Sequence, residues 1–245
     1  MNVVIFGATR GMGRALARLL ADRKDAIFLL GRSADELAHS AADLEARGAK
    51  RPVGHAVCDL GEPDSFDAGL GRAVAELGRL DAVVLTAGAF ASQEALEDSA
   101  ELTQRVLTFN FTNAVLFCEA ARRLLLKQGG GVLCAFSSVA GDRGRKPVVL
   151  YGASKAGLSA YLEGLDHRYH AAGLRVVNVK PGFVKTDMTA GLTPPPFAGT
   201  AEGVAKTVAA ALDRPRPIVY APPIWRWILL VIRQLPRFVM RRIGF

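Results

Sequence analysis

Three glycines within seven residues follow directly on an apolar run near the start of the chain. Residues 2–6 (NVVIF) predict a short buried strand, and residues 7–13 (GATRGMG) lead into a segment of helical periodicity. Glycines between a strand and a helix permit a tight turn, and they let backbone amides approach a pyrophosphate at the positive end of the helix. The spacing of Gly7, Gly11 and Gly13 therefore predicts a dinucleotide-binding fold; the alternative is a turn that merely needs glycine.

Short apolar runs alternate with longer helical patterns along the rest of the chain. Continuous apolar strands that are each followed by a helix form parallel sheets covered on both faces. We therefore expect an α/β fold, with a single doubly wound, Rossmann-type, seven-stranded parallel sheet and helices on both faces. Residues 1–221 would form this catalytic domain, and 222–245 a basic amphipathic C-terminal tail. The expected strands are 2–6, 26–30, 53–57, 82–85, 131–136, 174–179 and 217–220, and the expected helices are 11–23, 34–47, 63–77, 99–127, 151–172 and 200–212.

Residues 188–199 (MTAGLTPPPFAG) interrupt this alternation. Three successive prolines exclude a helix that runs through the segment. Because the segment follows the sixth expected strand, it is either a mobile flap over a substrate or an ordinary surface loop.

The net charge of +8 is concentrated at the C-terminal end. Seven arginines follow Asp213, the last acidic residue, so residues 1–213 carry almost no net charge. The positive charge is therefore not spread over the protein as in a nucleic-acid-binding surface, and we expect no nucleic-acid partner. The cysteines, Cys58, Cys118 and Cys134, are widely spaced and form no zinc pattern. We therefore expect reduced thiols, no metal site and a cytoplasmic protein, with no room for a signal peptide before the glycine motif.

The end of the second expected strand indicates which dinucleotide would bind. An acidic residue there would bond the ribose 2′-hydroxyl and repel a 2′-phosphate, but this chain has Gly31, Arg32 and Ser33. Arg10 lies in the glycine loop, and two guanidinium groups would clamp a 2′-phosphate. We therefore predict NADP(H) over NAD(H); the alternative is that both arginines are solvated loop residues.

A tyrosine and a lysine one helical turn apart are candidates for proton transfer. Tyr151 and Lys155 lie on the same face of an expected helix. A free phenol has a pKa near 10, and we expect the nearby ammonium to lower the pKa of Tyr151, which then donates a proton to a developing alkoxide or removes one in the reverse direction. The hydroxyl of Ser138, just past a strand end, would hold the substrate oxygen against Tyr151.

Seven motifs follow one another along residues 1–221: GATRGMG at 7–13, CDL at 58–60, TAG at 86–88, Asn110, SSVAG at 137–141, YGASK at 151–155 and PG at 181–182. In this order, they resemble the short-chain dehydrogenase/reductase family. The resemblance implies an oxidoreductase with a nicotinamide cofactor, assembled as a homodimer or homotetramer through the helices that carry Asn110 and Tyr151.

The resemblance assigns catalytic roles to four residues. Tyr151 would be the acid/base, and Lys155 would bond the nicotinamide ribose and tune Tyr151. Ser138 would orient the carbonyl, and Asn110 would hold a water that relays protons through Lys155. Two departures, Phe6 before the first glycine and Thr86 in place of asparagine, remove no catalytic group, although Phe6 loses one supporting hydrogen bond.

The resemblance also implies a set of cofactor-binding residues. Asp59 would contact adenine, Gly88 would lie along the cofactor, and residues 181–186 would meet the nicotinamide carboxamide. The complete set is Gly7, Thr9, Arg10, Gly11, Met12, Gly13, Arg32, Ser33, Asp59, Leu60, Ala87, Gly88, Tyr151, Lys155, Pro181, Gly182, Val184 and Thr186.

The tail at 222–245 carries five arginines and no acidic residue. Its longest uninterrupted apolar run is 227–232, and a membrane-spanning helix needs about twenty residues, so the tail is too short in apolar sequence to span. Arginines at helical spacing among tryptophans and aliphatic residues favour a segment at an anionic membrane interface, with Pro236 kinking or dividing the helix. The alternative is a helix that packs on the body or on a partner subunit.

Residues 142–147 (DRGRKP) place three cations between Ser138 and Tyr151, where they would hold a substrate phosphate, unless the loop is solvated or contacts a subunit. Together, this loop, residues 180–189 (KPGFVKTDMT) and the arginine-rich tail are similar to decaprenylphosphoryl-2-ketoribose reductases. That similarity implies a keto-sugar on a polyprenyl phosphate, reduced at the inner face of the cytoplasmic membrane. The alternatives are a reductase of another lipid ketone, such as a 3-keto-lipid or a sterol, and a membrane-docked regulatory protein that binds NADPH.

Overall fold

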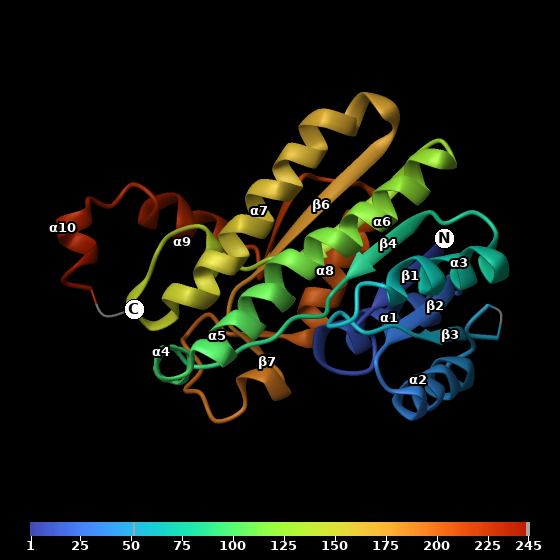
Figure 1. Cartoon of the computed structure of the whole chain (residues 1–245), viewed down its shortest axis with the longest axis horizontal. Coiled ribbons are helices and arrows are strands. Elements are labelled where there is room, and N and C mark those ends of the chain that lie inside the picture. The colour runs from blue at the N-terminus through green and yellow to red at the C-terminus, as the bar shows by residue number, and fades with distance from the viewer. Residues whose placement is uncertain (51, 244–245) are drawn as a thin grey trace.

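A seven-stranded parallel sheet forms the centre of the computed structural model, which describes residues 1–50 and 52–243 (Figure 1). The strands lie in the order β3-β2-β1-β4-β5-β6-β9, and each neighbouring pair is parallel. The order reverses between β1 and β4, where the carboxyl ends of strands in such sheets border a crevice. The expected fold class is confirmed. The strands are β1 (Asn2–Phe6), β2 (Ala26–Gly31), β3 (Gly54–Val57), β4 (Ala82–Leu85), β5 (Gly131–Phe136), β6 (Leu174–Pro181) and β9 (Ile218–Ala221).

Helices bury both faces of the sheet. Side chains of β1 alternate between two apolar clusters, with Val3 and Ile5 on one face and Val4 and Phe6 on the other. Figure 1 shows α6 and α7 across the front of the sheet and α8 behind it. One face is covered by α1 (Gly11–Asp22), α2 (Ala34–Ala46) and α8 (Ala201–Asp213), and the other by α3 (Ser65–Leu77), α6 (Ala114–Lys127) and α7 (Val149–Tyr169).

Phe6, which stands directly before Gly7 and departs from the family pattern there, packs in the core. Its ring makes edge contacts with Phe66 of α3 and Phe117 of α6, with centroid distances of 6.3 and 4.9 Å. The side chain is therefore part of the core between sheet and helices. Thr86 supplies hydrogen bonds nearby, because its hydroxyl lies 3.0 Å from the carbonyl oxygens of both Phe6 and Gly7.

The single helix expected at 99–127 is divided in the structure. It consists of α5 (Ala100–Leu107), a π-helical turn (Thr108–Asn113) and α6. A short helix that the periodicity did not predict, α4 (Gln93–Asp98), precedes it. The hydroxyl of Ser99 accepts a hydrogen bond from the amide of Leu102, so it caps α5 and separates the two helices.

The proline-rich segment is a loop whose ends are joined. β7 (Val184–Lys185), which precedes the loop, pairs with β8 (Gly199–Thr200), which ends it.

Beyond the sheet, the tail forms α9 (Trp225–Ile232) and α10 (Arg237–Met240), and Pro236 divides them as expected. Residues 244–245 of the expected tail lie outside the described residues. Within the described residues, no helix is both long and apolar enough to cross a membrane.

A buried ion pair holds the 142–147 loop in place. Nζ of Lys180 in β6 lies 2.5 Å from the Asp142 carboxylate, and the Tyr220 hydroxyl donates to its other oxygen at 2.6 Å. The loop is thus fixed to β6 and β9, beside the tail. Arg143 donates to the carbonyl oxygen of Leu235 and Lys146 to that of Arg241, at 2.7 and 2.6 Å.

Candidate functional site

The first turn of α1 comes very close to the end of β1. Gly7 has a φ of +96° and Gly11 one of +51°, which favour glycine. A Cβ on Gly13 would lie 2.1 Å from the carbonyl oxygen of Gly7, so glycine is required there. Arg10 is the N-cap residue of α1 and makes no side-chain cap hydrogen bond within the described chain. The first amides of the helix thus fit an anionic group such as a pyrophosphate.

The two arginines proposed for the 2′-phosphate lie beside an acidic residue. Arg10 donates to the carboxylate of Glu36, and this hydrogen bond, together with the charge of Arg10, holds the pKa of Glu36 below the usual range, with a smaller contribution from Arg32. Ser33 caps α2 by accepting from the amide of Glu36 at 3.3 Å. The pattern SADE at 33–36 is a capping-box sequence, so the position of Glu36 was available in the sequence but was missed. Glu36 competes with any phosphate for Arg10.

The loops after β3 and β4 hold the remaining residues of the predicted adenine side. Asp59 follows β3, and its carboxylate accepts from the amide of Gly61 at 2.8 Å. Leu60 is fixed by Asn113, whose side-chain amide donates to the Leu60 carbonyl at 2.8 Å. Sequence reasoning missed Asn113. Ala87 and Gly88 follow β4, and a Cβ on Gly88 would lie 3.4 Å from both the Asn110 side-chain oxygen and Lys155 Nζ.

Ser138, Tyr151 and Lys155 line one cleft, together with Met12, Gly88 and the segment Pro181–Thr186. Ser138 Oγ accepts from the amide of Ala140 at 3.1 Å, and it lies close enough to Tyr151 to lower the pKa of the phenol. Lys155 Nζ donates to the carbonyl oxygen of Phe136 at 3.0 Å. The structure therefore brings together three of the four side chains that sequence analysis selected for catalysis.

Asn110, in the π-helical turn, is not among the residues that line this cleft, but it lies beside Gly88, which is. Its side-chain oxygen accepts from the amide of Ala89, and its side-chain nitrogen donates to the Ala89 carbonyl, both at 2.8 Å. These bonds fix the loop after β4 against the helix. Asn110 is 1% exposed, so it contacts the loop rather than solvent.

Burial dominates the pKa values of Tyr151 and Lys155. Loss of hydration raises the pKa of Tyr151 to about 12, although Ser138 and the cation of Arg145 oppose the shift. Burial also lowers the pKa of Lys155 to about 8. The prediction that Lys155 lowers the pKa of Tyr151 is wrong for this structure. The phenolate is penalised more by burial than it is stabilised by neighbouring charge, although Lys155 Nζ lies 5.9 Å from the centroid of the Tyr151 ring.

The three cations expected to bind a substrate phosphate line one pocket with Arg237 and Arg241, but they do not all face the catalytic cleft. Of Arg143, Arg145 and Lys146, only Arg145 lines the cleft. The other two bind backbone carbonyls of the tail instead. The loop is therefore a contact between the body and the tail, with one cation directed to the site.

The proline-rich loop and the tail complete the cleft. Met188, Leu192 and Pro195 contribute from the loop, and Trp225 contributes from α9. A Cβ on Gly182 would lie 1.9 Å from Nε1 of Trp225, so the indole lies directly against this glycine. Sequence reasoning missed Trp225, because nothing local in the tail indicates that one of its side chains reaches the cleft.

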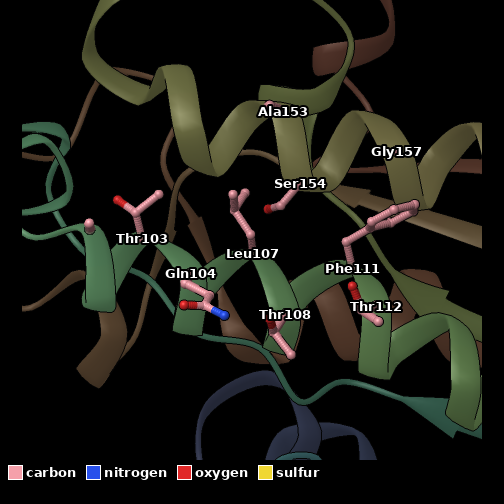
Figure 2. A pocket seen from close by; sticks show the side chains of 10 residues that line it. Thr103, Gln104, Leu107, Thr108, Phe111, Thr112, Ala153, Ser154 and Gly157 are labelled. Atoms are coloured by element: carbon pink, nitrogen blue, oxygen red, sulfur yellow. The ribbon is translucent and has the colours of Figure 1, made fainter.

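A second hollow lies between α5, the π-helical turn and α7. Figure 2 shows Leu107 and Phe111 directed toward Ser154 and Gly157 of α7. A Cβ on Gly157 would lie 3.0 Å from the Phe111 ring, so the two helices approach closely. Asp, Glu, Lys and Arg are absent from the described lining of this groove. The expected homodimer or homotetramer through these helices stays a prediction.

Known proteins share both the sequence and the fold. The family model described as short chain dehydrogenase matches residues 1–196. An uncharacterized oxidoreductase of Mycobacterium tuberculosis is 36% identical over 240 residues, which cover 98% of this chain and 96% of that protein. A cis-4-hydroxycyclohexanecarboxylate dehydrogenase of Sinomonas cyclohexanicum is 33% identical, covering 89% of this chain and 86% of that protein. The solved structure of a short-chain type dehydrogenase/reductase from Mycobacterium ulcerans has a TM-score of 0.79 at 24% identity, covering 89% of this chain and 86% of that chain.

The burial of Lys155 predicts a pH dependence of stability. Its pKa is about 8 in the folded chain against 10.5 when exposed, so between these values the unfolded chain binds the additional proton. This group therefore makes the free energy of unfolding rise with pH in that window. Between pH 8 and 10.5, the free energy of unfolding of the wild type should rise by on the order of 2–3 kcal/mol more than that of Lys155→Met. Urea unfolding at each pH measures the difference. Tyr151 and the cysteines are present in both proteins, so their contributions to the pH dependence cancel in the comparison. If the free energies of unfolding of the two proteins followed parallel pH profiles, the prediction would be contradicted.

Proposed function

Since the chain belongs to the short-chain dehydrogenase family, we propose that it transfers a hydride between NADPH and a ketone or secondary alcohol. It is an oxidoreductase of this type, a class that uses nicotinamide cofactors. The observation that carries the proposal is the meeting of Ser138, Tyr151 and Lys155 in one cleft with Gly88 and Pro181–Thr186. The cofactor would supply the hydride, with its pyrophosphate at the first turn of α1.

The protein side of the chemistry is a proton transfer in a dry site. A phenol with a pKa of about 12 stays protonated at neutral pH, so Tyr151 is prepared to donate its proton to the oxygen of a reduced ketone. Ser138, which opposes the rise in the pKa of Tyr151, would hold that oxygen. Lys155 would bond the nicotinamide ribose, and Asn110 would support the proton path behind it.

Removing the phenolic hydroxyl should abolish most turnover. Tyr151→Phe keeps the ring, which contacts Phe90 at a centroid distance of 5.2 Å, but removes the proton donor. We expect kcat/KM for ketone reduction to fall by about 10²–10⁴, measured by NADPH absorbance with a panel of lipid-linked ketones. NADPH binding should be retained in the variant. Equal turnover by both proteins would contradict the role of Tyr151, and absence of turnover by the wild type across the panel would favour the NADPH-binding regulatory protein.

The preference for NADP(H) is proposed from charge. Arg32 follows β2 at the position where an acidic residue would repel a 2′-phosphate, and Arg10 faces it from the glycine loop. Glu36 neutralises part of this charge, so Arg32 would supply most of the discrimination.

Exchanging the charge at this position tests the preference. Arg32→Asp should lower the NADPH/NADH ratio of kcat/KM by about 10- to 100-fold, because a charge-assisted hydrogen bond is lost and a repulsion is added. Glu36→Gln is the matched variant, and it should raise the ratio by freeing Arg10. An unchanged ratio in Arg32→Asp would refute the assignment.

For the substrate, we favour a ketone on a hydrophobic or lipid-linked molecule, with a keto-sugar on a polyprenyl phosphate as the leading candidate. The support is the lining of the cleft, which is mainly apolar. Reductases of other lipid ketones remain the alternative class. The apolar lining residues are Phe90, Val139, Pro147, Val148, Phe183, Met188, Leu192, Pro195 and Trp225.

We also propose that the outer face of α9 and α10 binds an anionic bilayer. Figure 1 shows these helices at one end of the molecule, and Trp227 is 60% and Phe238 63% exposed there. Leu230 and Val231 are exposed on the same helix as Trp227. Exposed aromatic and aliphatic side chains among cations match the interface of a membrane with anionic headgroups. The exposed cations of this tail are Arg226, Arg233, Arg237, Arg241 and Arg242, of which Arg237 and Arg241 also line a pocket toward the 142–147 loop.

Flotation with liposomes tests this surface. The double variant Trp227→Ser/Phe238→Ser should lose most binding to phosphatidylglycerol vesicles, because the apolar contribution is removed while every arginine remains. Binding by the wild type should weaken with salt and be absent with neutral vesicles. Ile218→Ser, an exposed apolar position on β9, is the control and should float like the wild type. Equal flotation of wild type and double variant would refute the proposal; unlike deletion of 224–245, these changes keep Trp225.

A further inference from the structure

The pocket between the 142–147 loop, the start of α7 and α10 is separate from the catalytic cleft, and we call it the loop–tail pocket. Its volume is about 630 Å³, which is within the range of small-molecule sites. Its wall combines cations of the loop and of α10 with apolar surface from Val149 and Met240. Ala140 and Arg145 line both spaces, so the pocket adjoins the cleft.

Four cations of the loop–tail pocket lack a carboxylate partner in the described part of the chain. Asp142, at the start of the loop, is bound to Lys180 and Tyr220 instead. Aspartate and glutamate are absent from the described wall of the pocket. The four cations, none of which belongs to an ion pair within residues 1–50 and 52–243, are Arg143 and Lys146 of the loop and Arg237 and Arg241 of the tail.

The hydrogen bonds of the two loop cations leave their charge in place. Arg143 donates to the Leu235 carbonyl and Lys146 to the Arg241 carbonyl, and a carbonyl oxygen is a neutral acceptor. A guanidinium has five N–H donors and an ammonium has three, so each bond uses one donor of several. These bonds therefore hold two positive charges beside α10 without neutralising them.

The arrangement brings like charges together. Arg237 and Arg241 are exposed and stand one helical turn apart, a spacing at which like charges repel. Lys146 is held against the same turn by its bond to Arg241. The opposite wall includes the first turns of α7, whose N-cap residue Val148 makes no side-chain cap hydrogen bond within the described chain. An anion between these walls would relieve the repulsion and accept charge-assisted hydrogen bonds, and arginine suits phosphate because its N–H donors bind two oxygens at once.

We propose that the loop–tail pocket binds a phosphate group that carries an apolar chain. The four cations would hold the phosphate, and Val149 and Met240 would contact the chain. Two sources have this chemistry, the headgroup of a membrane phospholipid and an isoprenoid phosphate. The site differs from the outer face of α9, where exposed aromatic and aliphatic side chains would contact a bilayer. It also does not depend on the proposed hydride transfer, because Ser138, Tyr151 and Lys155 line the other space.

The methionines of the chain report where a ligand binds. Met240 lines the loop–tail pocket, whereas Met12 and Met188 line the cleft. The full chain, labelled with ¹³C-methyl methionine and free of NADPH, is titrated with geranyl phosphate and with dihexanoyl phosphatidylglycerol, both below their micelle concentrations. We expect at least one of them to shift the Met240 signal, which Met240→Leu assigns, and geraniol to leave it in place.

The outcomes of this titration distinguish the sources. A shift of Met240 with geranyl phosphate alone would support an isoprenoid phosphate, and a shift with the phosphatidylglycerol would support a membrane headgroup. No shift with either compound, a shift confined to Met12 and Met188, or an equal shift with geraniol would overturn the proposal. Inorganic phosphate that bound as tightly as the chain-bearing compounds would overturn it as well, because the apolar wall would then contribute nothing.

Two double variants separate the pocket from the general charge of the tail. Arg237→Gln/Arg241→Gln should raise the dissociation constant of the phosphate ligand by roughly 10- to 100-fold, because two charge-assisted hydrogen bonds are lost. Arg226→Gln/Arg242→Gln removes the same charge from exposed tail positions outside the described wall of the pocket, and it should bind like the wild type. All four arginines are exposed, so both variants should unfold at the temperature of the wild type. Equal weakening in the two variants, or none in the first, would overturn the site. Binding requires neither NADPH nor turnover, so a failure of the proposed reductase activity would be recognised separately.

Discussion

The close approach of α1 to the end of β1 is the constraint on which the site depends. A side chain at position 13 would collide with the backbone of Gly7 and with Thr86, so the helix meets the strand only because glycine is present. Thr86 reinforces this contact from β4 through its bonds to the carbonyl oxygens of Phe6 and Gly7. The turn directs the amino end of α1 to the same edge of the sheet where β4, β5 and β6 deliver the other site residues. A parallel sheet makes this convergence possible, because all its strands end at one edge.

Burial sets the chemical character of the cleft. Enclosure keeps the Tyr151 phenol protonated and weakens the ammonium of Lys155, so both groups are closer to their neutral forms than they would be in water. The same effect acts on Cys58, whose pKa is raised to about 11, and a thiol of this kind is a poor nucleophile. A shifted pKa is therefore not enough to mark a reactive group in this molecule. Tyr151 and Lys155 differ from Cys58 because they also line the cleft.

The tail has two faces with different environments. Its inner face packs Trp225 and Leu229 against Val139 and closes the cleft, while its outer face exposes aromatic, aliphatic and arginine side chains. The 142–147 loop links the tail to the cleft, because Arg143 and Lys146 donate to tail carbonyls and Arg145 lines the cleft. Binding of the outer face to a surface would place the opening of the cleft in a fixed relation to that surface.

The sequence by itself determined the framework and most of the central site. Apolar runs predicted each strand of the seven-stranded sheet to within a few residues, since burial on both faces leaves a continuous apolar signal. The glycine spacing and the single helical turn between Tyr151 and Lys155 are local relations, and local geometry can be read from residue order.

Only the tertiary structure decided which partners the charged and aromatic side chains take. Glu36 pairs with Arg10, Lys146 binds a carbonyl 95 residues away, and Trp225 packs directly against Gly182. The raised pKa of Tyr151 likewise follows from enclosure by several elements. These contacts join segments far apart in the chain, so they exist only once the packed elements fix the distances between them.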